Sequence, residues 1–225
     1  MSEARSAVLP IRRVGGLGTA VSVLVGVVVV LDLVSTWTTW NAYGLVRDYV
    51  NRVNEVAAAD LDSADDTSSA VGWGYTAAVV AAGVVFVTWL WRARDNAEAI
   101  CPAPHRRSRG WAVGSWICPV VNLRFPFVFV DDVYRASRPD NPPDLYDLRS
   151  VQGNRVLGLW WAFWLCGVIV SYLAVVTWRR AASIDTLRTS AVMETIASVA
   201  MVGAAVTIIM IVREISGWQD DRARA

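Results

Sequence analysis

Lysine is absent from the sequence, and histidine and cysteine are scarce. All 21 basic residues are arginine, His105 is the single histidine, and the three cysteines, Cys101, Cys118 and Cys166, form no Cys-x-x-Cys pair. Zinc sites need several such ligands at close spacing, and small secreted folds need paired cysteines. Neither a metal centre nor a disulfide framework is therefore predicted.

Catalytic and nucleic-acid-binding patterns are also missing. No serine or cysteine motif offers His105 a nucleophile. Asp131 and Asp132 are neighbours, so on a helix they point about 100° apart, which favours capping or pairing with Arg135 over a shared metal ion. The acidic run at 60–69 lacks the glycine and the terminal glutamate of a calcium-binding EF-hand loop. The arginines flank apolar segments instead of forming one stripe, so we predict a non-enzymatic protein without cofactor or nucleic acid.

Long apolar segments are abundant. Hydrophobic residues make up 55% of the chain, and Asp32 is the one charged residue between Arg13 and Arg47. Because a helix rises about 1.5 Å per residue, roughly 20 residues cross a hydrocarbon core about 30 Å thick. The sequence predicts an all-α integral membrane protein with four transmembrane helices, at 15–37, 73–91, 157–178 and 194–212.

The distribution of arginine predicts how these helices are oriented. With the N-terminus inside, 16 arginines fall on the cytoplasmic side and 5 outside, as the positive-inside rule requires. Both termini are then cytoplasmic, and we expect a bacterial cytoplasmic membrane with lipid as the first partner. The connecting segments are predicted as cytoplasmic ends at 1–14 and 213–225, a cytoplasmic loop at 92–156, an outer loop at 179–193, and an outer amphipathic helix followed by a flexible acidic linker at 38–72.

A fifth span is the alternative interpretation of the segment at 111–136. It is long enough, but it contains Pro119, Asn122, Arg124 and Pro126. A central arginine costs roughly 2.5 to 3.5 kcal/mol on insertion scales, and proline interrupts a regular helix. Crossing here would also nearly remove the arginine asymmetry. We therefore predict a proline-broken interfacial or re-entrant helical segment.

Four polar residues in or beside the apolar segments are candidate functional groups: Asp32, Asn122, Arg124 and Asp131. An ionisable group within a span must find a partner, a wet cavity or a proton, although Asp32 could also reach interfacial water. The favoured function is an interaction or accessory protein with a protein partner or a second copy. The alternative is a small-solute or ion transporter or channel subunit, with a polar path near Asp32, Asn122 and Arg124.

Three stretches carry a family resemblance: WLWRARDNAEA at 89–99, GWAVGSWICPVVNLRFPFVFVDDVYRAS at 110–137 and WWAFW at 160–164. Over about 73–212 the chain resembles the bacterial membrane-protein family of domain of unknown function 4328. The resemblance implies a multi-pass membrane protein and supplies no activity. The residues that match the family pattern are Arg92, Asn96, Gly110, Trp111, Trp116, Pro119, Asn122, Leu123, Pro126, Asp131, Arg135, Ala136, Ser137, Trp160, Trp161 and Trp164.

Overall fold

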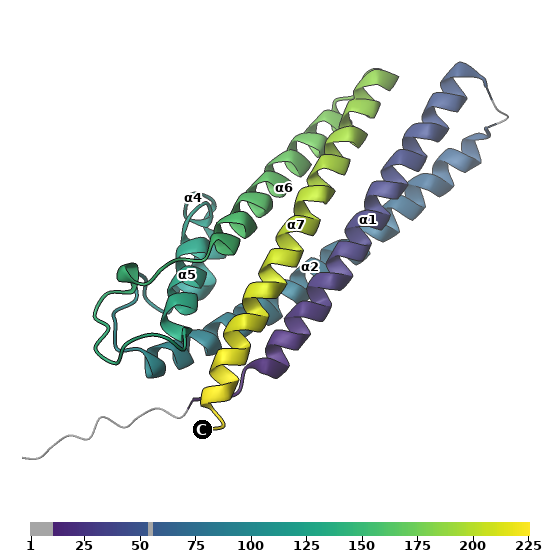
Figure 1. The fold of residues 1–225 in the computed structure, drawn as a ribbon. Coiled ribbons are helices and arrows are strands. Elements are labelled where there is room, and N and C mark those ends of the chain that lie inside the picture. The colour runs from purple at the N-terminus through teal and green to yellow at the C-terminus, as the bar shows by residue number, and fades with distance from the viewer. Residues whose placement is uncertain (1–10, 54–55) are drawn as a thin grey trace, which may run out of the picture. The chain divides into compact units, whose positions relative to one another are not determined.

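The computed structural model describes residues 11–53 and 56–225, and within these ranges it contains helices, turns and no strand. The all-α prediction is confirmed. The elements are α1 (Gly15–Asn51), α2 (Ala58–Ile100), α3 (Trp111–Ile117), α4 (Pro119–Asn122), α5 (Phe125–Ser137), the 3-10 turn η1 (Leu148–Ser150), α6 (Arg155–Arg179) and α7 (Ile184–Arg222) (Figure 1).

Four of these helices, α1, α2, α6 and α7, are long and apolar enough to cross a membrane. They contain 37, 43, 25 and 39 residues, whereas about 20 suffice for a crossing. Each includes one of the four predicted spans. The extra length of α1 lies in the predicted amphipathic helix, and that of the other three helices lies in segments predicted as loops, linker or cytoplasmic tail.

The acidic segment at 60–69 is helical, so its prediction as a flexible linker was wrong. Asp60 lies in the first turn of α2, where a carboxylate is favoured by the helix dipole, and it accepts a 2.9 Å hydrogen bond from the amide of Ala57. Ser63 and Thr67 donate to carbonyl oxygens of the preceding turn, at 2.9 and 2.8 Å. These residues often favour loops, but here they are satisfied within the helix.

The second predicted outer loop, 179–193, is shorter than expected because α7 already begins at Ile184. The hydroxyl of Ser183 accepts a 3.2 Å hydrogen bond from the amide of Thr186, which caps the start of this helix. At the other end of the chain, α1 continues to Asn51 and joins the predicted first span to the predicted amphipathic helix.

Residues 111–137 form three short helices, and prolines lie at two of their starts. Cys118 has an extended backbone, as expected for a residue before proline, and Pro119 then begins α4. Pro126 lies in the first turn of α5, where its missing N–H costs no helical hydrogen bond. Leu123 and Arg124 separate α4 from α5.

The chain divides into two compact units, and each long helix contributes to both. We call the described residues of 1–22, 83–158 and 208–225 the loop unit, because it includes α3, α4, α5 and η1. Residues 23–82 and 159–207 form the helix unit, whose described residues contain helices α1, α2, α6 and α7 and no other.

Candidate functional site

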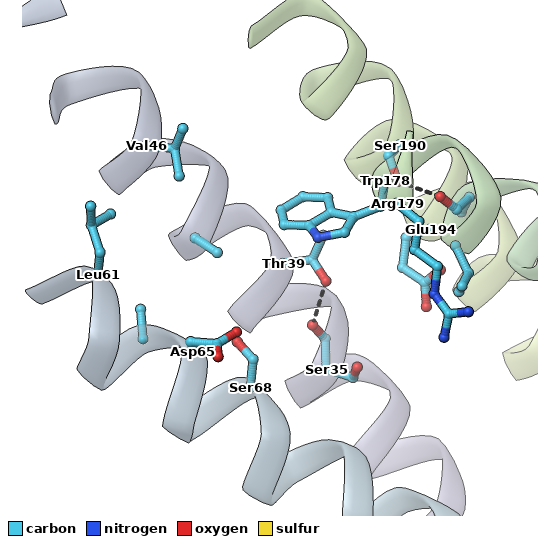
Figure 2. Close-up of a pocket in the computed structure, with 14 residues that line it drawn as sticks. Ser35, Thr39, Val46, Leu61, Asp65, Ser68, Trp178, Arg179, Ser190 and Glu194 are labelled. Carbon is cyan, nitrogen blue, oxygen red and sulfur yellow. Dashed lines mark hydrogen bonds between the residues drawn. The ribbon is translucent and has the colours of Figure 1, made fainter. Parts of the chain in front are cut away.

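The helix unit contains a cavity of about 430 Å³ between residues of all four of its helices (Figure 2). Two of its wall residues are acidic, Asp65 from α2 and Glu194 from α7, and one is basic, Arg179 from α6. The indole of Trp178 supplies a large aromatic surface. The cavity is lined by Ser35, Thr39, Ala42, Val46, Leu61, Ala64, Asp65, Ser68, Ala174, Val175, Trp178, Arg179, Ser190 and Glu194.

Two hydroxyl groups in the cavity wall are already used by the helices. Thr39 donates to the carbonyl oxygen of Ser35 at 3.1 Å, and Ser190 donates to that of Ala174 at 2.7 Å (Figure 2). The charged side chains therefore provide the strongest interactions that the cavity can offer to a polar molecule.

Asp32 lies one turn before Ser35 on α1 and is 7% exposed. One turn further along α1, Oγ1 of Thr36 lies 2.6 Å from Oγ of Ser198 on α7. Within the part of the chain that the structure describes, Oδ2 of Asp32 has no hydrogen-bond partner. Burying a carboxylate oxygen without a hydrogen bond costs free energy, because the oxygen loses its contacts with water and gains none in return.

Glu194 is a site residue that the sequence analysis missed, because it was treated only as the end of a span. It lies one helical turn before Ser198 on α7 and lines the cavity. Its Oε2 lies 3.5 Å from the hydroxyl of Ser171 on α6. The spacing of Glu194 and Ser198, four residues apart, was the signal that could have placed both on one helix face.

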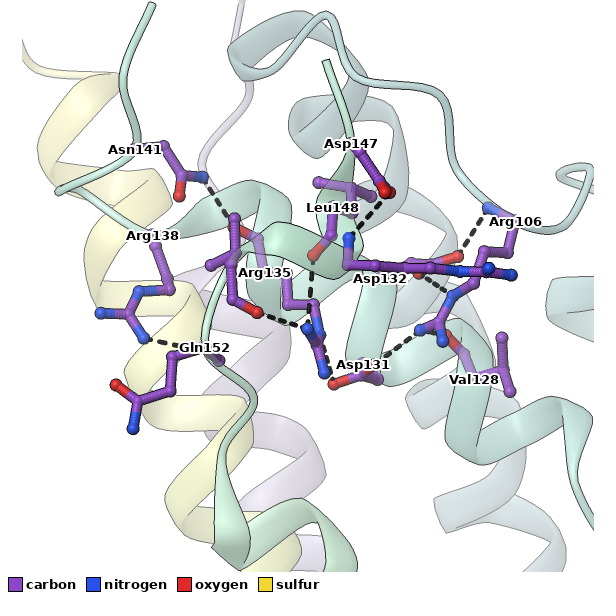
Figure 3. Close-up of polar contacts among 12 residues, drawn as sticks. Arg106, Val128, Asp131, Asp132, Arg135, Arg138, Asn141, Asp147, Leu148 and Gln152 are labelled. Carbon is purple, nitrogen blue, oxygen red and sulfur yellow. Dashed lines mark hydrogen bonds and ion pairs between the residues drawn. The ribbon is translucent and has the colours of Figure 1, made fainter. Parts of the chain in front are cut away.

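In the loop unit, Arg106 joins two neighbouring carboxylates (Figure 3). Its Nη2 lies 2.5 Å from Asp131 and its Nε lies 2.6 Å from Asp132, whose carboxylate also accepts the Arg106 amide at 2.8 Å. The two aspartates diverge on α5, but the guanidinium is wide enough to reach both. Burial raises the pKa of Asp132, outweighing the opposing effect of Arg106.

Arg135 is the partner that the sequence predicted for this pair, and it contacts Asp131 at 2.9 Å. It also donates to the carbonyl oxygens of Leu148 and Val151, which holds the η1 loop against α5 (Figure 3). Gly153 permits this approach, because a Cβ there would lie 2.6 Å from Nη2 of Arg135.

A second polar cluster in the loop unit centres on Gln219, whose side chain is fully buried. It donates to Oγ of Ser137 at 2.8 Å and to the carbonyl oxygen of Ala93 at 2.9 Å, and it accepts from Asn96 at 2.9 Å. Asn96 also bonds both backbone groups of Arg12, at 2.9 and 2.7 Å. One glutamine thus connects α2, α5 and α7.

The last turns of α7 also bond the start of α1 and the end of α5. The carboxylate of Asp220 accepts from the amides of Val14 and Gly15, at 2.8 and 3.2 Å, and so caps α1. Arg222 donates to the carbonyl oxygens of Ser137 and Arg138, at 2.9 and 2.8 Å. The two ends of the described chain therefore meet in the loop unit.

The four predicted polar residues are divided between the units. Asp32 belongs to the helix unit, and Asn122, Arg124 and Asp131 belong to the loop unit. Asp131 is in the Arg106 network. Arg124 is exposed just before α5, and Oδ1 of Asn122 is buried without a hydrogen-bond partner among residues 11–53 and 56–225.

The residues that carried the family resemblance have identifiable structural places. Asn96 and Ser137 belong to the Gln219 cluster, and Asp131 and Arg135 to the Arg106 network. Gly110, Pro119 and Pro126 lie at the starts of α3, α4 and α5, Ala136 is buried, and Arg92 and Leu123 are exposed. The aromatic members make ring contacts: Trp111 with Phe125, Trp116 with Phe86, and Trp161 with both Trp160 and Trp164.

A family model described as Domain of unknown function (DUF4328) matches residues 52–217, which include the Arg106 network but end before Gln219. No curated protein and no solved structure matches the chain. Because the matched region covers well over half of the sequence, the chain belongs to the DUF4328 family.

Proposed function

We propose that the chain is an integral membrane protein that crosses the bilayer four times, with spans at 15–37, 73–91, 157–178 and 194–212. The exposed faces of its long helices support this. Val23 and Val30 on α1, Val84 on α2 and Val199 on α7 are each about 60% exposed or more. In water these side chains would remain unburied, whereas in hydrocarbon they are solvated by lipid tails.

Both termini belong on the same, arginine-rich side of the membrane in this proposal. The hydrogen bonds from Val14 and Gly15 to Asp220 support it, because an even number of crossings returns the chain to the side where it began. The segment at 111–123 lies at the membrane interface on that side. Its exposed Val113, Val120 and Leu123 favour contact with lipid.

Cysteine labelling tests this topology. Cys101, Cys118 and Cys166 are first replaced by serine, and single cysteines are then introduced as Ser183→Cys or Asp144→Cys. A membrane-impermeant maleimide should label position 183 on intact cells and position 144 only after permeabilisation. Labelling of both positions on intact cells, or of position 144 alone, would contradict the four-span topology.

The cavity of the helix unit supports a solute-binding function, and we place the protein among small-solute transporters or channel subunits. The observation that carries this is the composition of the cavity wall. It contains two acidic residues, Glu194 and Asp65, and the indole of Trp178, but one basic residue, Arg179. Carboxylates pair with ammonium groups, and an indole face attracts a cation. The solute class that fits is a small organic cation. The interaction or accessory role remains a prediction from sequence.

A binding assay tests this function. A panel of small amines and quaternary ammonium ions is added to the full chain in lipid nanodiscs, and the thermal unfolding midpoint is recorded. At least one compound should raise it, and Glu194→Gln should weaken that compound's binding about tenfold or more, the equivalent of roughly 1.4 kcal/mol. Asp185→Asn, on the exposed first turn of α7, is the matched control. The absence of any response, or an unchanged response in Glu194→Gln, would reject the function.

A further inference from the structure

The cavity of the helix unit is lined by charged side chains of both signs that do not pair with one another. Asp65 from α2, Arg179 from α6 and Glu194 from α7 all line it. Within residues 11–53 and 56–225, every ion pair of 4.0 Å or less joins other residues. No protein charge therefore neutralises these three groups at contact distance.

We propose that the cavity binds a basic amino acid, a molecule with one carboxylate and two cationic groups. The carboxylate pairs with Arg179, and the cationic groups pair with Glu194 and Asp65. The inference rests on the proposed function, because it names the class of small organic cation that this cavity takes.

The first argument is charge balance. The wall contributes two negative charges and one positive charge, so a ligand that pairs with each of them has two positive charges and one negative charge. A diamine leaves the guanidinium of Arg179 without a partner and brings like charge toward it, which costs free energy. An amino acid with a single ammonium group leaves one of the two carboxylates unpaired. A basic amino acid leaves none.

The second argument is the placement of the charges. Figure 2 shows Asp65 on the α2 side of the cavity, whereas Arg179 and Glu194 lie on the side of α6 and α7. In a basic amino acid the carboxylate and the α-ammonium group share one carbon atom, and the second cationic group ends an aliphatic chain. A guanidinium binds a carboxylate through two parallel hydrogen bonds. The indole of Trp178 supplies apolar surface for the chain.

The third argument is size and access. The volume of about 430 Å³ lies in the range of about 300–1,000 Å³ that is typical of small-molecule sites. Asp65 and Arg179 are exposed to water, and Glu194 is half-buried. Asp65 and Arg179 also lie outside the four proposed spans. A charged ligand can therefore reach the cavity without entering hydrocarbon.

Calorimetric titration of the full chain in lipid nanodiscs tests the role of Arg179. The probes are free L-lysine and cadaverine, which is lysine without its carboxylate. Lysine should bind at least tenfold more tightly than cadaverine. Arg179→Gln should remove this preference by weakening lysine binding about tenfold without weakening cadaverine binding. Arg180→Gln is the matched control, because Arg180 is exposed and does not line the cavity, and it should keep the preference.

A third probe tests the role of Asp65. Norleucine is lysine without its side-chain ammonium group, and it should bind the wild-type chain at least tenfold more weakly than lysine. Asp65→Asn should reduce this difference by weakening lysine binding alone. Asp66→Asn is the matched control, because Asp66 is exposed beside Asp65 and does not line the cavity.

The inference is overturned if the wild-type chain binds cadaverine as tightly as lysine, or if Arg179→Gln keeps the preference for lysine. Circular dichroism checks the fold of each variant, and the Asp65→Asn comparison decides if Arg179→Gln is unfolded. Amines that bind through Glu194 without a preference for lysine reject the basic amino acid and retain the proposed function. The absence of binding by any probe or amine rejects both.

Discussion

The two units of the chain treat buried aspartates in opposite ways. In the loop unit, Asp131 and Asp132 are buried, and each contacts Arg106 at 2.6 Å or less. In the helix unit, Asp32 is buried, and its Oδ2 has no hydrogen-bond partner among the described residues. A buried charge that forms an ion pair is neutralised within the fold, whereas a buried charge without one needs a ligand or a proton to neutralise it. The difference assigns structure to one region and binding to the other.

The two units also differ in the size of the side chains that they bury. The largest fully buried side chains, which include Trp89, Phe129, Ile211 and Ile215, all lie in the loop unit. Half of the buried residues on α6 and α7 of the helix unit are alanines, and a Cβ on Gly203 would lie 3.0 Å from the Phe163 ring. Small residues let helix backbones approach where lipid supplies no hydrophobic driving force.

The largest expected effect on stability comes from removing one partner of a buried ion pair in the loop unit. Asp131→Asn removes the carboxylate that contacts both Arg106 and Arg135. Breaking a buried ion pair leaves an unpaired charge, and we expect the free energy of unfolding to fall by about 3 kcal/mol. Detergent-induced unfolding in mixed micelles, followed by circular dichroism, measures it.

Asp140→Asn is the matched control. Asp140 pairs with Arg138 at 2.5 Å, but its side chain is 61% exposed, so the loss should stay below about 1 kcal/mol. Equal losses in the two variants would show that burial does not distinguish these ion pairs, and the contrast between the units would lose its main support.

Removing the Gln219 hydrogen bonds is expected to have the next largest effect. Gln219→Leu keeps the volume but leaves Ser137 and Asn96 each without one buried partner. The expected loss is about 2 kcal/mol of unfolding free energy. The exposed Gln152→Leu is the control and should change little. A Gln219→Leu variant as stable as the wild type would mean that the helix ends are held by apolar packing alone.

The four long helices could be predicted from sequence because charge-free runs of the required length leave little alternative to a helix in lipid. The helical state of 60–69 could not, because four aspartates favour a linker in composition. These residues form one continuous helix with the predicted span at 73–91, and local hydrogen bonds such as those of Asp60 and Thr67 stabilise it.

The polar contacts were predictable only where they are local. The pairing of Arg135 with Asp131 follows from a spacing of four residues on one helix. The contact of Gln219 with Asn96 spans 123 positions, and no local pattern points to it. Glu194 is intermediate, because its helix was predicted, but its place in the cavity wall depends on how the four helices pack.

A variant with a larger side chain at Gly203 tests how closely the helices of the helix unit pack. Gly203→Leu places a side chain where the Phe163 ring already lies, and overpacking should cost about 1.5 kcal/mol of unfolding free energy. Gly26→Leu is the matched control, because a Cβ on Gly26 meets no atom within 4 Å. The same unfolding assay compares the two variants. A tolerated Gly203→Leu would argue against close packing of α6 on α7.

The smallest expected effect concerns His105 in the loop unit, where burial lowers the pKa of the imidazole from 6.5 to about 4, with a further contribution from Arg94. The unfolded chain therefore binds more protons than the folded chain between these two values, and stability falls as the pH falls through 6.5. Between pH 7 and pH 6 the loss should be about 0.7 kcal/mol. His105→Gln should remove this slope, and Asp140→Asn should keep it. A slope that His105→Gln leaves unchanged would assign the proton uptake to another group and would contradict the lowered pKa of His105 in the loop unit.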